Sequence, residues 1–362
     1  MDNNYGQYGG QIPPVQPVPP PYYDLSGYVD PEEKKRIRKN YNSIGITLLS
    51  DYILGNGLFY AAIITLSLFF GYETVSDENG TMIFGAVEIV LSTWILAFAG
   101  MIVFVGYCIF TGYDPKELFS VKGIKAGELT KYILLVLGLQ KASLICTIFV
   151  SMFLNSFGLE VTAFDYVMAH DPQTYAADFI SSIILAPIAE ELIFRGVVLR
   201  CSAKISGRFA IFFSALMFGL MHGNPYQFVL AFLIGIPLAM IAMKTGSIIP
   251  SIICHMANNL LVEAYSIMEY FDEDLAYALN LLSIPVFIII GIIVLVIMIR
   301  KGEMKLPPYT ERHKKRTLPI VITSWSIILV TVFYIIDTIQ SLGPIDSSVQ
   351  ETVTEAARRF LI

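Results

Sequence analysis

Two adjacent glutamates stand inside an apolar stretch, Ser181 to Arg200, that is long enough to cross a bilayer. About 20 residues at ~1.5 Å each span the hydrocarbon core. A charge at the bilayer centre costs about 2.5–3.5 kcal/mol on insertion scales, so such residues usually face a polar interior and carry a function. On a helix, Glu191 and Arg195 share a face, while Glu190 points about 100° away. We expect Arg195 to neutralise Glu191 and to leave Glu190 free for a cavity.

Two of the four histidines lie in apolar stretches that follow this segment, and each belongs to a pair with helical spacing. The pairs are Phe218-x-x-x-His222 and His255-x-x-x-Asn259, so the members of each project from one helix face. Measured from basic residues taken as the inner boundary, Glu190 lies ~15 Å deep, His222 ~21 Å and His255 ~17 Å. These depths agree to within about one helical turn of 5.4 Å. The three side chains are therefore expected to meet near the bilayer centre.

A glutamate and two histidines in a sheltered pocket are equipped for hydrolysis. The carboxylate can take a proton from water and pass it to a leaving amine. A neutral histidine can position that water, and a second histidine with an asparagine can donate hydrogen bonds to an oxyanion. Alternatively, Glu190, His222 and His255 could bind Zn²⁺. The spacing does not distinguish these two chemistries.

The sequence motifs of other classes of intramembrane protease are missing from this chain. There is no His-Glu-x-x-His pair of zinc ligands on one helix and no Gly-x-Gly-Asp signature of aspartyl proteases. No Gly-x-Ser-Gly nucleophile motif is present either. The four cysteines have no Cys-x-x-Cys spacing, so neither a disulfide framework nor a thiolate zinc site is indicated.

The composition is that of a polytopic membrane protein, with 55% hydrophobic and 15% charged residues and a mean hydropathy of +0.63. No basic tract indicates nucleic-acid binding. We predict an all-α transmembrane helical bundle with about nine spans. The predicted spans are 44–71, 83–111, 132–155, 176–200, 208–222, 225–243, 247–268, 277–300 and 318–340.

The loops between these spans alternate in charge, which predicts the orientation. A basic cluster, Glu32 to Asn40, precedes the first span, and Lys and Arg recur in alternate loops as far as the stretch from Arg300 to Arg316. The other loops are acidic or nearly free of Lys and Arg. Because basic loops stay cytoplasmic, we expect the N-terminus inside and the C-terminus outside.

Three regions follow from this pattern. Residues 1–40 are expected to be a disordered, Pro- and Tyr-rich cytoplasmic tail with a basic juxtamembrane segment. Residues 41–340 form the membrane domain, and residues 341–362 form a C-terminal tail. Two further polar residues, Asp51 in the first span and Lys141 in the third, could line a proton path or form a structural ion pair. Neither is assigned to the site.

Taken together and in order, the three motifs resemble the CPBP family, also called Abi, of CAAX prenyl proteases and bacteriocin-processing membrane proteases. The family pattern is a di-glutamate with an arginine four residues after the second Glu, then Phe-x-x-x-His, then His-x-x-x-Asn. Here it reads Glu190-Glu191-x-x-x-Arg195, Phe218-x-x-x-His222 and His255-x-x-x-Asn259. The resemblance covers about residues 176–265.

The resemblance implies an intramembrane endopeptidase of a bacterial cytoplasmic membrane. Its substrate would be a prenylated CAAX-like protein, a bacteriocin or another membrane-associated peptide. Glu190 and His222 would activate water, His255 and Asn259 would stabilise the oxyanion, and Glu191 and Arg195 would support the site. Two other classes stay open, namely a non-catalytic immunity or scaffold protein of the same fold and a transporter. Metal dependence and oligomeric state are left undetermined.

Overall fold

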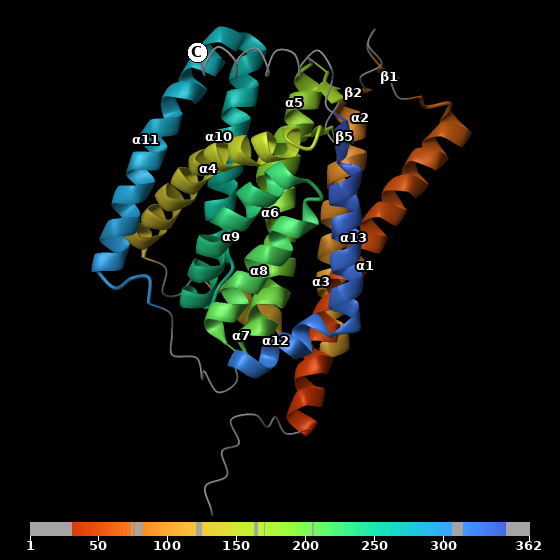
Figure 1. The fold of residues 1–362 in the computed structure, drawn as a ribbon. Coiled ribbons are helices and arrows are strands. Elements are labelled where there is room, and N and C mark those ends of the chain that lie inside the picture. Colours follow the sequence, from red (N-terminus) through yellow and green to blue (C-terminus); the bar gives the residue numbers. More distant parts are fainter. Residues whose placement is uncertain are drawn as a thin grey trace, which may run out of the picture.

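The computed structural model describes residues 31–73, 75–76, 82–120, 125–162, 166–169, 171–204, 206–305 and 314–344. Within them the chain is a bundle of helices with a few short strands (Figure 1), which confirms the predicted all-α class. Most of the two predicted tails, residues 1–30 and 345–362, lies outside the described residues.

The long helices form where the apolar stretches predict spans. By length and composition, five described helices could cross a membrane: α1 (Pro31–Phe70), the continuous helix Ala86–Thr111, α4 (Ala126–Asn155), α9 (Pro225–Thr245) and α11 (Glu273–Arg300). The second of these consists of α2 (Ala86–Ile89), the π-helical η2 (Val90–Trp94) and α3 (Ile95–Thr111), and a 3₁₀ turn, η3 (Pro115–Phe119), follows it. Other helices at predicted spans are α8 (Gly207–Met221), α10 (Ile249–Phe271), α12 (Lys314–Ile322) and α13 (Trp325–Gln340). The number of nine crossings stays a prediction.

The first helix begins earlier than the predicted span, because the basic juxtamembrane segment is itself helical. Pro31 fits the first turn of a helix, and Glu32 and Glu33 favour its positive end. One face of the segment is buried at helical spacing, which packs it against the bundle. The buried residues on this face are Ile37, Tyr41, Ile44 and Leu48.

The di-glutamate stretch is one continuous helical run, residues 172–203, in which α-helical and π-helical segments alternate. The wider π-helical turns are rare and often occur at functional sites. Pro187 lies just after the first π-helical segment and has no N–H to donate to the preceding turn. The segments are α5 (Pro172–Phe179), η4 (Ile180–Leu185), α6 (Ala186–Glu191), η5 (Leu192–Leu199) and α7 (Arg200–Ala203).

The last predicted span, 318–340, is wrong as a single helix, since the chain breaks between α12 and α13. The hydroxyl of Thr323 donates to the backbone carbonyl of Pro319 at 2.6 Å, and the hydroxyl of Ser324 donates to that of Ile320 at 2.8 Å. Ser324 has an extended backbone, with ψ of 114°. Such local side-chain bonds compete with helical ones and allow the break.

Short strands join the loops at the end of the bundle opposite the start of α1 (Figure 1). Strands β1 (Val75–Ser76), β2 (Met82–Phe84) and β4 (Tyr166–Met168) form one sheet, in which β2 and β4 are parallel. Strands β3 (Leu159–Val161) and β5 (Leu342–Pro344) form an antiparallel pair with Glu160 opposite Gly343. This pair links the ends of α4 and α13.

Ion pairs connect the helices at the other end, where α1 begins. Lys244 of α9 pairs with Glu128 of α4, and Lys131 of α4 pairs with Glu303 just after α11. The Nζ of Lys244 also donates to the backbone carbonyl of Glu303 at 3.1 Å. Basic segments that were predicted to be cytoplasmic therefore gather at this end.

Two glycines bring α4 and α11 into backbone contact. A Cβ added at Gly138 would lie 2.7 Å from the Cα of Gly291 and 2.8 Å from the carbonyl oxygen of Phe287. Small residues allow such close approach, which supplies packing energy where no hydrophobic effect drives helices together. Both helices pack against α10, which carries His255 and Asn259 of the candidate site.

Candidate active site

Glu190 and Glu191 occupy the last turn of α6, between the two π-helical segments. Their side chains differ sharply in exposure: Glu191 is fully buried, whereas the side chain of Glu190 is 21% exposed. The helix therefore turns one carboxylate into the protein interior and the other toward open space.

Glu191 forms the expected ion pair with Arg195, whose Nη1 donates to Oε1 at 2.8 Å. Both side chains have 0% exposure. The Nη2 of Arg195 donates to the carbonyl of Gly235 at 3.2 Å, and the guanidinium lies 4.5 Å from the ring centre of Phe218. The charge of Arg195 is thus shared among a carboxylate, a carbonyl and an aromatic face, and it is not available to a substrate.

His255 lies between the two glutamates. Its Nδ1 is 3.2 Å from Oε1 of Glu191, and its Nε2 is 3.6 Å from Oε2 of Glu190. Because the ionised Glu191 can only accept, Nδ1 of His255 carries the proton. The other ring nitrogen, Nε2, therefore faces Glu190.

His222 stands at the end of α8, where the helix stops at Gly223 with a positive φ of 64°. Its Nδ1 donates to the carbonyl of Phe218 at 2.8 Å, so the neutral ring has a free acceptor at Nε2. With 15 residues, α8 is about 22 Å long and shorter than the ~30 Å hydrocarbon core. The following turn is covered by protein, since Asn224 is 1% exposed and Gly223 packs against Asp337.

Phe218 contacts both histidines. Its ring centre is 5.1 Å from that of His222 and 5.6 Å from that of His255, in edge-to-face geometry. Because Phe218 also covers Arg195, packing between the ion pair and both histidines accounts for its place in the motif.

Asn259 lies one turn beyond His255 but does not join the same contacts. Its Nδ2 donates to the carbonyl of Ser182 at 2.6 Å, and its Oδ1 accepts from Asn258 at 2.9 Å. These bonds connect α10 to η4. Neither His255 nor Asn259 is among the residues that line the cavity described next.

A cavity of about 330 Å³ opens beside Glu190 and His222. Its walls come from five parts of the chain: α1, the 86–111 helix, the α6–η5 run, α8 and α13. The polar lining includes two carboxylates that were not assigned to the site, Asp51 of α1 and Asp337 of α13. The hydroxyl of Tyr52 donates to Asp337 at 2.8 Å. Its position in an apolar span was the sequence signal for Asp51, but only the packing of α1 against α3 and α13 brings it to this cavity.

Lys141 lies elsewhere. Its Nζ donates to Oδ1 of Asn280 at 2.7 Å and lies 4.4 Å from the ring centre of Tyr265. The contacts connect α4 to α11 and α10, and Lys141 does not line the cavity. Leaving Lys141 out of the site agrees with this arrangement, whereas leaving Asp51 out does not.

The donor types of Glu190, His222 and His255 suit Zn²⁺. Across the described ranges, however, no three His, Cys, Asp or Glu side chains are placed so that they could hold a metal ion. The Nε2 of His255 faces Glu190, and Nδ1 of His222 is bonded to the carbonyl of Phe218. The residues as arranged do not fit a zinc site.

Residues 172–261 match the family model described as type II CAAX prenyl endopeptidase, Rce1-like. The matched segment runs from α5 into α10 and contains all six candidate residues. No curated protein matches the chain, and no solved structure matches it. The family match confirms the resemblance predicted from the three motifs. The cavity walls supplied by α1, α3 and α13 lie outside the matched segment.

Proposed function

We propose that this multi-pass membrane protein is an intramembrane endopeptidase, because residues 172–261, which carry the site, match the family model of type II CAAX prenyl endopeptidases. One observation carries the proposal: Glu190 faces Nε2 of His255 at 3.6 Å and lines the same cavity as His222. A carboxylate and an imidazole that line one cavity can hold and deprotonate a water.

In the proposed reaction, one water binds between the carboxylate of Glu190 and Nε2 of His222. Glu190 takes a proton from it, and the oxygen attacks the carbonyl carbon of the scissile peptide bond. The same proton then passes from Glu190 to the leaving amine, which returns the carboxylate to its starting state. His255, fixed by its bond to Glu191, orients Glu190 and supports the proton during the transfer.

The roles of His255 and Asn259 at the oxyanion stay predictions, because neither lines the cavity in this arrangement. Zinc binding by Glu190, His222 and His255 stays a prediction that their arrangement among the described residues does not support. The family description names prenylated CAAX proteins, so we propose a lipid-anchored peptide as the substrate class. Bacteriocin processing and a bacterial cytoplasmic membrane are narrower proposals, which rest on the motif resemblance alone.

The test is cleavage of a prenylated CAAX peptide by the reconstituted full chain and by Glu190→Gln. We expect kcat/KM to fall by about 10²–10⁴-fold, since general acid–base catalysis typically contributes that much. The matched control is Glu263→Gln, another buried glutamate, which lies in α10 and does not line the cavity. If the folded Glu190→Gln protein cleaves as well as the wild type, the enzyme proposal fails and the non-catalytic alternative gains.

A further inference from the structure

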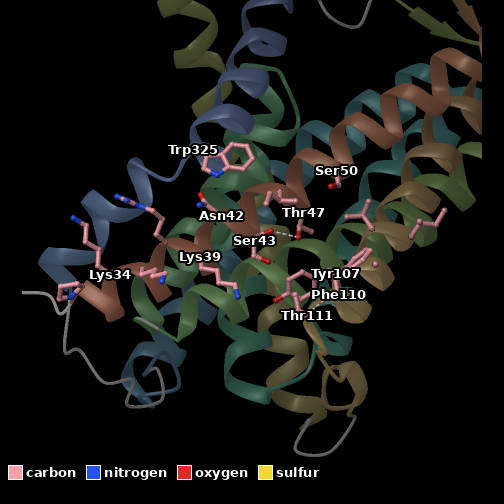
Figure 2. Close-up of a pocket in the computed structure, with 17 residues that line it drawn as sticks. Lys34, Lys39, Asn42, Ser43, Thr47, Ser50, Tyr107, Phe110, Thr111 and Trp325 are labelled. Atoms are coloured by element: carbon pink, nitrogen blue, oxygen red, sulfur yellow. Dashed lines mark hydrogen bonds between the residues drawn. The ribbon is translucent and has the colours of Figure 1, made fainter.

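A groove of about 1110 Å³ lies at the basic end of the bundle, between α1, α3 and the start of α13 (Figure 2). It shares no lining residue with the candidate active-site cavity. We propose that this groove binds one anionic phospholipid of the cytoplasmic leaflet. The proposal does not depend on the proteolytic function.

The headgroup end of the groove is strongly basic. Lys34, Lys35, Arg38 and Lys39 line it, and no acidic side chain is part of its lining. Arg38 also donates to the hydroxyl of Thr323 at 3.3 Å, which fixes one cation at the mouth. Basic pockets between membrane helices on the cytoplasmic side are typical binding sites for anionic headgroups.

Beyond the cations the groove becomes first hydroxyl-rich and then apolar. Ser43 and Thr47 follow the lysines along α1 in Figure 2, and Trp325 lies beside them. The α3 wall includes Ile102 and Phe110, which are 59% and 91% exposed. Hydroxyls suit glycerol and ester oxygens, and the exposed apolar side chains suit an acyl chain.

The length of the groove fits a single leaflet. Ser50, at its deep end, lies 11 residues after Lys39, which corresponds to about 17 Å along the helix. Half of a ~30 Å hydrocarbon core is about 15 Å. A phospholipid with its headgroup at the lysines would therefore have its acyl chains alongside the rest of the groove.

The separation from the active-site cavity favours a lipid over the peptide substrate. Ser50 lines the groove, whereas its neighbour Asp51 lines the other cavity, so the two openings lie on different sides of α1. A peptide bound in the groove would not reach Glu190 without leaving it. A resident lipid has no such requirement.

The test uses the full chain in neutral detergent, with bound lipid counted by native mass spectrometry during titration with phosphatidylglycerol or phosphatidylcholine of equal chain length. We expect one phosphatidylglycerol to bind at least about tenfold more tightly than phosphatidylcholine, because the headgroup meets four cations. The triple variant Lys34→Gln, Lys35→Gln, Lys39→Gln should lose this preference. Its matched control is Arg300→Gln, Lys301→Gln, Lys305→Gln, which removes three charges near the end of α11 and should keep it.

A second variant tests the apolar part. Gly106 lines the groove, and a Cβ added there meets nothing within 4 Å, so Gly106→Phe adds a bulky side chain at an open position of the groove wall. We expect it to weaken phosphatidylglycerol binding at least about tenfold with all charges retained. Gly57→Phe on α1 is the control, since Gly57 is equally open and lies outside the groove.

Three results would overturn the proposal. One is equal binding of both lipids to the wild type, and another is an equal loss in both charge triples. The third is unchanged phosphatidylglycerol binding in folded Gly106→Phe, which would show that only the charged surface binds the lipid and that the apolar part of the groove does not contribute. Displacement of the lipid by a prenylated peptide at equal concentration would assign the groove to the substrate instead.

Discussion

The buried pair of Glu191 and Arg195 positions the residues of the site and does not itself face the cavity. Both side chains are fully buried, and Glu191 also accepts from Nδ1 of His255. The pair therefore fixes the tautomer of a histidine whose other nitrogen faces Glu190. Removing one partner leaves an uncompensated buried charge, which typically lowers the free energy of unfolding more than removing both partners does.

We predict that Arg195→Met lowers the free energy of unfolding by about 3–5 kcal/mol, because it leaves Glu191 buried and unpaired. The double variant Glu191→Gln, Arg195→Met should regain part of this loss. Unfolding in mixed micelles with increasing SDS measures both. The control is Arg208→Met, which changes an exposed arginine and should have an effect below about 1 kcal/mol. An unchanged midpoint in Arg195→Met would show that the pair contributes nothing.

Asp51 gives a second prediction for single residues. It lines the cavity together with Glu190 and His222, where a bound water or substrate would lie. Asp51→Asn replaces one acceptor oxygen of the cavity wall by a donor, so kcat should fall about tenfold with KM nearly unchanged, which corresponds to about 1.4 kcal/mol of lost transition-state stabilisation. Steady-state cleavage of the prenylated peptide measures this. Ser50→Asn, on the other side of α1, should leave kcat unchanged, and a larger effect there would contradict the prediction.

Spacing alone was enough to predict the contacts made within one helix. Glu191 and Arg195 are four residues apart, as are Phe218 and His222, and both pairs are in contact. For residues on different helices, the sequence predicted only that they lie at a similar depth in the bilayer. The position of Asp51 beside Glu190 depends on how α1 packs, for which the local sequence contains no signal. For the same reason, the bond from Asn259 to Ser182 was not foreseen.

At the level of helices, the di-glutamate turn lies between two π-helical segments, η4 and η5. Hydrophobic periodicity does not separate an α-helix from a short π-helical insertion, so this irregularity was not predicted. The early start of α1 was predictable in principle, because Pro31 followed by two glutamates is a helix start signal. The break before α13 depends on hydrogen bonds from two hydroxyls to the preceding turn. The average hydrophobicity of a stretch does not reveal such bonds.

The contact between α4 and α11 yields a prediction for a helix pair. Gly138→Ala places a methyl group within 2.7–2.8 Å of the opposing backbone, which has to move apart. We expect a lower thermal midpoint and a loss of about 1–3 kcal/mol, as for other overpacked sites. The matched control is Gly127→Ala on the same helix, where a Cβ meets nothing within 4 Å. Equal stability of the two variants would show that the close approach of α4 and α11 does not limit the size of the residue at position 138.

For the whole molecule, the two ends of the bundle differ in charge and in construction. Lysine–glutamate pairs connect the helices at one end, and short strand pairs connect the loops at the other. This division agrees with the orientation expected from the basic loops, in which the end with the lysines is cytoplasmic.

The orientation can be tested with single introduced cysteines. In intact cells, a membrane-impermeant maleimide should label Glu273→Cys at the start of α11 and should not label Lys301→Cys just beyond its end. Lysis should make both sites reactive, which controls for burial, since both residues are exposed. The reverse pattern would invert the predicted topology.

The active-site cavity has two kinds of wall. Glu190 and His222 belong to the segment 172–261 that matches the family, whereas Asp51, Tyr52, Tyr334 and Asp337 come from helices outside it. If the proposed hydrolysis is correct, the two groups that activate water come from one stretch of the chain, and much of the wall that contacts the peptide comes from two others. Substitutions in α1 and α13 at cavity positions other than Asp51 would then change which peptide is admitted, and divergence among related proteins would concentrate at those positions.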